Sequence, residues 1–153
     1  MRKNLNYEPN VLEAFVQSCR DNGGPNFLLG QRRFAGEDGT LTDQDTGKIF
    51  SAELTEIADE NIKKRNAYLI KKKGVGEAYE SYGAKQAIET IKKKEEKYSD
   101  LEERILILDA FSCVPFSWVD YWQPIIDYGQ KTRFAGIYAC GMDRGKVVYL
   151  KIK

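Results

Sequence analysis

The stretch Arg104-Ile105-Leu106-Ile107-Leu108-Asp109-Ala110 decides the fold, because it contains four consecutive large apolar residues. An uninterrupted apolar run of this length is typical of a strand that is buried on both faces. We therefore expect residues 104–110 to form the central strand of a sheet, with the remaining elements arranged around it.

Upstream of this strand, apolar residues recur at helical spacing in three segments. The first covers residues 9–22 and ends at Gly23-Gly24-Pro25. The second covers residues 51–73, with Ser51 as a possible N-cap, and the third runs to residue 97 after the break at Gly74-Val75-Gly76. We expect the second and third segments to form an αα-hairpin over residues 51–97.

The other segments favour short strands and one more helix. Residues 27–34 are typical of a strand, and residues 36–50 of a β-hairpin with Asp and Gly in its turns. Residues 117–128 have helical spacing despite Pro124, and residues 134–140 and 146–153 predict a second hairpin around a five-residue turn. The expected fold is α+β, with a mainly antiparallel sheet and helices on one side.

Composition excludes several function classes. The chain has 153 residues, enough for a single domain over residues 1–153, and 24 Lys+Arg against 23 Asp+Glu leave a net charge of +1. This balance is not that of a dedicated nucleic-acid binder. The chain has no histidine, which removes the commonest general base and metal ligand. We expect a non-enzymatic protein without metal or cofactor.

The cysteines and the N-terminal segment indicate the compartment. Cys19, Cys113 and Cys140 are odd in number and far apart, so no disulfide framework or zinc site is indicated. The first residues lack an apolar targeting segment, and no run of 18 apolar residues occurs. We expect a cytoplasmic protein with reduced thiols and no membrane partner.

Residues 111–128, FSCVPFSWVDYWQPIIDY, are the most aromatic part of the chain and hold both tryptophans. Such a segment either completes the core, which we favour for Trp118 and Trp122, or forms a recognition surface. A surface of this kind, with charges at its edge, would bind a protein without chemistry. The candidate partner-binding residues are Phe116, Trp118, Asp120, Tyr121, Trp122, Asp127, Tyr128 and Arg144.

Two alternatives use other residues. RNA or DNA binding would use the helical lysines Lys71, Lys72, Lys73, Lys92, Lys93 and Lys94, although acids at i,i+4 spacing favour an ordinary solvated helix face. A small enzyme would place its site near Asp109, at the end of the central strand, and Cys113 in the loop after it. Without a histidine, Cys113 would need another group to activate it.

Residues 15–24, FVQSCRDNGG, are an amphipathic segment that runs into Asn-Gly-Gly. This phrase resembles part of the SUKH-type immunity proteins, which neutralise bacterial polymorphic toxins. The whole chain also resembles, in general character, the small immunity proteins of contact-dependent and type VI toxin systems. The resemblance implies an antitoxin that inhibits one cognate toxin by direct binding, and it assigns no functional residue.

Overall fold

The structure, a computed structural model, describes residues 7–57, 79–111 and 119–153, which form an α+β fold. Its helices and strands follow one another along the chain as α1 (Tyr7–Asp21), β1 (Phe27–Gly30), β2 (Gly39–Asp43), β3 (Ile49–Glu56), α3 (Tyr79–Lys97), the short 3₁₀ helix η1 (Leu101–Glu103), β4 (Arg104–Asp109), α4 (Val119–Gln130), β5 (Gly136–Asp143) and β6 (Lys146–Lys151).

The six strands of the described residues lie in one sheet in the order of the chain, from β1 to β6. The pairs β1–β2, β2–β3 and β5–β6 are antiparallel, whereas β4 pairs in parallel with both β3 and β5. The sheet is therefore mixed, and the expectation of a mainly antiparallel sheet is wrong. The reason is that α3 and α4 precede and follow β4, and a helical crossover returns the chain to the start of the next parallel strand.

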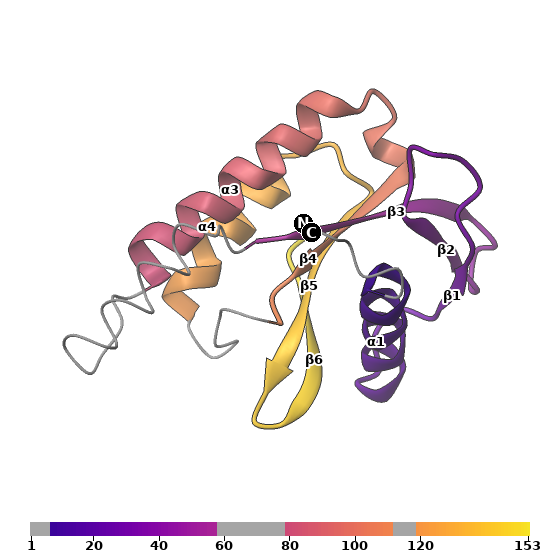
Figure 1. The fold of residues 1–153 in the computed structure, drawn as a ribbon, viewed down its shortest axis with the longest axis horizontal. Helices are drawn as coiled ribbons and strands as arrows, with labels where there is room; N and C mark the ends of the chain where they lie inside the picture. Colours follow the sequence, from indigo (N-terminus) through magenta and orange to yellow (C-terminus); the bar gives the residue numbers. More distant parts are fainter. Residues whose placement is uncertain (1–6, 58–78, 112–118) are drawn as a thin grey trace.

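Helices cover both faces of the sheet, which corrects the expectation of helices on one side (Figure 1). Ile105 and Ile107 of β4 pack into the core on the α1 side, and Leu106 and Leu108 into the core under α3 and α4. All six residues of β4 are buried. The predicted central strand is thus confirmed. Its apolar run is unbroken because successive side chains point to opposite faces of the sheet, and both faces are buried.

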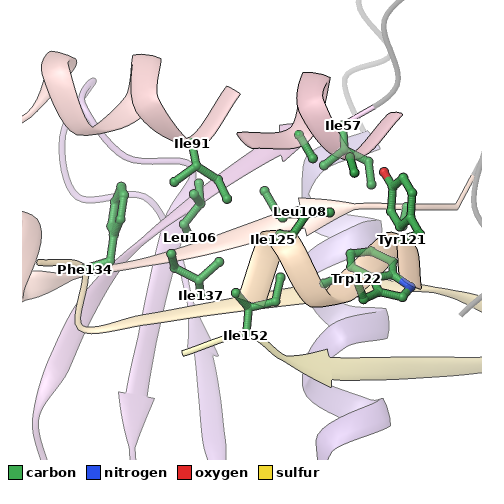
Figure 2. Packing of buried hydrophobic residues seen from close by; sticks show 14 of the residues in the cluster. Ile57, Ile91, Leu106, Leu108, Tyr121, Trp122, Ile125, Phe134, Ile137 and Ile152 are labelled. Atoms are coloured by element: carbon green, nitrogen blue, oxygen red, sulfur yellow. The ribbon is translucent and has the colours of Figure 1, made fainter. Parts of the chain in front are cut away.

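The larger core lies between the sheet and the pair α3–α4 (Figure 2). Ile91 of α3 and Ile125 of α4 are fully buried there against Leu106 and Ile137. The smaller core is aromatic: the ring of Phe15 in α1 lies 5.2 Å from that of Tyr138, and Phe27 lies 6.2 Å from Tyr138. Such pairs add to the free energy gained from burial alone.

The expected αα-hairpin over residues 51–97 is corrected at its start. Residues 51–56 belong to strand β3, and Ala52 and Leu54 face the α1 core while Ser51 and Glu53 lie on the opposite face. This alternation, together with the pairing of β3 with β4, prevails over a possible cap at Ser51. Residues 58–78 lie outside the described residues, and the expected third helical segment is present as α3.

Both predicted hairpins are present, with changes at their ends. Strand β1 ends at Gly30 rather than at residue 34. The C-terminal turn consists of Arg144 (φ 51°) and Gly145 (φ 79°), not of five residues. Two consecutive positive φ angles define the tight type I′ turn, which suits the twist of a hairpin. Helix α4 runs through Pro124 as one element.

Candidate interaction surface

Two of the candidate partner-binding residues lie in the core. Tyr121 is 0% exposed and Trp122 is 2% exposed, and their rings meet edge to face with centroids 4.9 Å apart. Figure 2 shows both among the apolar residues of α4 and the sheet. The core interpretation of Trp122 agrees with its burial, and Tyr121 packs in the same core.

The remaining candidates come from separate parts of the fold. Asp120 and Asp127 are exposed on α4, and Arg144 is exposed in the turn between β5 and β6. Tyr128 is half-buried and its hydroxyl donates a hydrogen bond to Glu95 of α3. Burial, followed by this contact, raises the pKa of Tyr128 to about 12. Phe116 and Trp118 lie outside the described residues.

The lysines of the nucleic-acid alternative are only partly described. Lys71, Lys72 and Lys73 lie outside the described residues. Lys93 is exposed, and Lys92 lies 3.6 Å from Glu89. Lys94 turns toward the sheet, where its Nζ lies 2.7 Å from Oε1 of the buried Glu53. In the described part of α3, these three lysines therefore do not form one free basic face.

Asp109 ends β4 as a buried carboxyl group, 3% exposed. Its Oδ1 accepts a hydrogen bond from the backbone N–H of Phe111 (3.0 Å), but burial is the larger effect and raises its pKa. Cys140, its neighbour in β5, is fully buried with a pKa raised by burial to about 12. That thiol stays protonated and unreactive near neutral pH. Cys113 lies outside the described residues.

The outer face of β1, β2 and β3 carries an apolar row that the sequence reading missed. Leu28 pairs with Thr42, and Thr42 pairs with Ile49, so the three residues lie side by side across the strands. They point away from α1, because the alternating neighbours Phe27 and Leu41 pack into the α1 core. Leu28 is 51% exposed and Ile49 is 49% exposed.

A surface hollow adjoins this row. It has a volume of about 460 Å³ and is lined by Arg33, Phe34, Ile49, Ser51, Asp100 and Glu103. Phe34 is 47% exposed, and the guanidinium of Arg33 lies 5.6 Å from the centre of its ring. We call the residues Leu28, Phe34, Thr42 and Ile49 the β1–β3 face. It combines apolar side chains with a charged rim.

Glu37 fixes the chain beside the hollow. Its buried carboxylate accepts hydrogen bonds from the Arg33 guanidinium (Nη2 to Oε1, 2.9 Å) and from the Ser51 hydroxyl (2.7 Å). Burial alone would raise the pKa of Glu37, but the hydrogen bonds from Arg33 and Ser51 together lower it. The loop that carries Arg33 and Phe34 is therefore held to β3 by charge-assisted bonds.

Arg104 forms a second buried polar contact set at the start of β4. Its Nε donates to Asp100 (2.7 Å) and its Nη1 to the carbonyl of Gly36 (2.7 Å). Its guanidinium lies 3.7 Å from the ring centre of Tyr98, and Nη1 lies 3.9 Å from Oε2 of Glu53. These contacts connect the start of β4 to the loop at Gly36, to Asp100 before η1, and to β3.

One sequence signal could have located this face. In β2 and β3, threonine and serine alternate with buried apolar residues, which is typical of a sheet with one open face. The helical interpretation of residues 51–73 obscured this pattern, because Leu54 and Ile57 are three residues apart, as on one face of a helix, whereas in the structure they lie in different cores.

Comparison with family models, curated proteins and solved structures finds no match to this chain. Within residues 7–57, 79–111 and 119–153, no helix combines the length and apolar character needed to cross a bilayer. The same residues contain no group of three or more Cys, Asp or Glu side chains placed to hold a metal ion.

Proposed function

We propose that this chain is a non-enzymatic cytoplasmic protein that binds one partner protein through the β1–β3 face. The observation that carries the proposal is the gathering of Leu28, Phe34 and Ile49, each about half exposed, on one side of the sheet end. Contiguous exposed apolar side chains with a polar rim are typical of protein interaction sites.

The charges around the hollow indicate the chemistry of the partner. Arg33 faces Glu37, Arg104 faces Asp100, and Lys94 faces Glu53. The exposed Glu103 at the rim attracts the Arg33 guanidinium, which is already bonded to Glu37, and its carboxylate can also face a basic group of a partner. A partner that fits would insert an apolar side chain between Phe34 and Ile49 and place a basic side chain opposite Glu103.

A toxin domain with a basic catalytic cleft meets this requirement. The resemblance of residues 15–24 to SUKH-type immunity proteins supports such a partner. In this proposal, Glu103 lies where a substrate phosphate would bind, and the apolar residues give contact area and exclude water. The chain then acts as an immunity protein that blocks the cleft without any chemistry of its own.

The test uses the protein encoded by the neighbouring open reading frame, purified and titrated by calorimetry. We expect Phe34→Ser and Ile49→Ser each to weaken binding at least tenfold, as loss of a central interface contact does. Met142→Ser is the matched control, because Met142 is 43% exposed on β5 and lies outside the β1–β3 face. It should bind like the wild type.

Three outcomes would overturn the proposal. The first is that Phe34→Ser and Ile49→Ser bind the partner as tightly as the wild type does. The second is that Met142→Ser weakens binding as much as those two variants. The third is that the purified chain turns over a substrate. A salt-dependent gel shift with RNA or DNA that is lost on changing Lys71, Lys72 and Lys73 to Glu would instead support the nucleic-acid alternative.

A further inference from the structure

Among the strands of the described residues, β1 is the outermost of the sheet, and one of its edges pairs with β2. The carbonyl of Asn26 accepts a hydrogen bond from the N–H of Gln44 (3.0 Å). Because bonded and non-bonded pairs alternate in an antiparallel ladder, Leu28 and Gly30 also bond toward β2. The backbone groups of Phe27 and Leu29 therefore point to the free edge.

The edge is short, at four residues, but its own side chains do not block strand pairing. The residues Phe27-Leu28-Leu29-Gly30 include no charge and no proline, two common means of blocking an edge. The guanidinium of Arg20 donates to the Phe27 carbonyl (3.1 Å), which leaves that oxygen a second lone pair. A groove of about 570 Å³ runs along the edge beside α1, lined in part by Glu13, Gln17, Arg20 and Leu29.

We propose that a second copy of this chain occupies the edge, with the two β1 strands antiparallel about a two-fold axis at Leu28. Phe27 of each copy then lies opposite Leu29 of the other, and both carry outward backbone groups. Each such pair exchanges two hydrogen bonds. The pairing joins two six-stranded sheets into one continuous sheet.

Charge complementarity favours a second copy as the occupant. Glu13 and Arg20 both line the groove and lie seven residues apart on α1, about 10 Å along its axis. Because Arg20 is bonded to Phe27, a two-fold axis at Leu28 brings Arg20 of one copy toward the Glu13 end of the groove in the other. In the two-fold dimer, Glu13 of each copy can therefore pair with Arg20 of the other.

The pairing also covers Leu28. Residues directly opposite in a non-hydrogen-bonded antiparallel pair have Cα atoms about 4.5 Å apart, so the two Leu28 side chains would be in contact. The rows of Leu28, Thr42 and Ile49 from both copies would form one apolar strip. This inference does not depend on the proposed partner protein.

Cysteine cross-linking tests the register. The variant Leu28→Cys should form a disulfide-linked dimer under mild oxidation, because the expected Cα separation suits a disulfide. The matched control is Ile49→Cys, which lies on the same face with equal exposure but two strands away. Ile49→Cys should cross-link no more than the wild type. The wild type itself measures any background cross-linking through Cys113.

The size of the unmodified chain gives an independent measurement. Sedimentation at tens to hundreds of micromolar should give twice the 17.5 kDa mass of one chain, and Leu28→Lys should return it to one chain by placing like charges at the axis. A wild type of single-chain mass throughout this range, or Leu28→Cys cross-linking no faster than Ile49→Cys, would overturn the proposal. Neither measurement uses a partner protein, so failure here leaves the proposed function separately testable.

Discussion

The middle of the sheet and its β1 end differ in how many of their faces are covered. The middle strands β4 and β5 lie between α1 on one face and the pair α3–α4 on the other. At the β1 end, α1 covers one face, and the other presents Leu28 and Ile49 at about half exposure. Two leucines show the contrast: Leu106 is fully buried, whereas Leu28 is 51% exposed.

Under the proposed function, the two regions have separate roles. Apolar side chains at the doubly covered middle stabilise the fold, while those at the singly covered end remain available for recognition. The buried charges of Glu37, Glu53 and Arg104 lie near the boundary between them. Their side chains form hydrogen bonds with backbone and side-chain groups where the apolar core ends. These bonds connect the loop and strands of the β1 end to one another.

The largest expected effect tests this division with one type of substitution. Leu106→Ala should reduce the free energy of unfolding by about 2–5 kcal/mol, because it leaves a cavity between β4 and the helices. Leu28→Ala should reduce it by less than about 1 kcal/mol, because much of that side chain is already in water. Urea unfolding followed by circular dichroism measures both. Equal losses would show that the β1 end is as tightly packed as the middle.

The buried charges give the next largest effect. Arg104→Ala should reduce the free energy of unfolding by about 2–3 kcal/mol, because it removes the charge-assisted hydrogen bonds to Asp100 and to the Gly36 carbonyl, while Glu53 keeps its contact with Lys94. The matched control is Arg133→Ala, which breaks an ion pair with Glu102 at 3.2 Å whose side chains are 62% and 59% exposed. It should change stability by less than about 1 kcal/mol. An equally small loss at Arg104 would mean that water replaces its contacts.

The sequence predicts the elements whose pattern has a single interpretation. The run Ile105-Leu106-Ile107-Leu108 identifies the central strand, because few other structures bury four consecutive apolar residues. The direction of its neighbours could not be predicted, since parallel pairing depends on crossovers that the pattern does not reveal. Residues 51–56 were ambiguous because Leu54 is spaced like a strand residue from Ala52 and like a helix residue from Ile57, and pairing with β4 decides for the strand.

The candidate surface was harder to predict than the fold. Tyr121 and Trp122 have the composition of an interface but fill the core, since the same amphipathic rings serve both purposes. Leu28, Phe34 and Ile49 come from separate elements, and no local pattern shows that the fold leaves them uncovered together. Exposure at a sheet end depends on where the helices lie, which is a property of the whole fold.

Two buried carboxyl groups, one at each region, should give opposite pH dependences. The lowered pKa of Glu37 means that its contribution to stability is present above its ordinary value of 4.5 and is lost as pH falls through the folded value. The raised pKa of Asp109 means that stability falls as pH rises from 3.8 through its folded value. Unfolding curves between pH 3 and pH 7 measure both effects.

Neutral variants separate the two contributions. Glu37→Gln should lower stability at pH 7 and reduce the loss on acidification, because the charge that pairs with Arg33 is gone. Asp109→Asn should raise stability at pH 7, because no buried charge must then be desolvated, and it retains an oxygen that can accept from Phe111. A shift in the same direction for both variants would contradict the assigned causes.

The smallest expected effect compares turns at the two regions. Gly145 in the β5–β6 turn and Gly47 in the β2–β3 turn both have φ near 79°, and a Cβ at either would meet nothing within 4 Å. Alanine at each should therefore cost about 1 kcal/mol from backbone strain alone. Arg144→Asn should instead stabilise by up to about 0.5 kcal/mol, because Asn-Gly suits two positive φ angles. Thermal unfolding of the three variants measures these changes in stability. A much larger loss of stability for Gly145→Ala than for Gly47→Ala would show that the β5–β6 hairpin contributes more to the core than backbone strain in its turn explains.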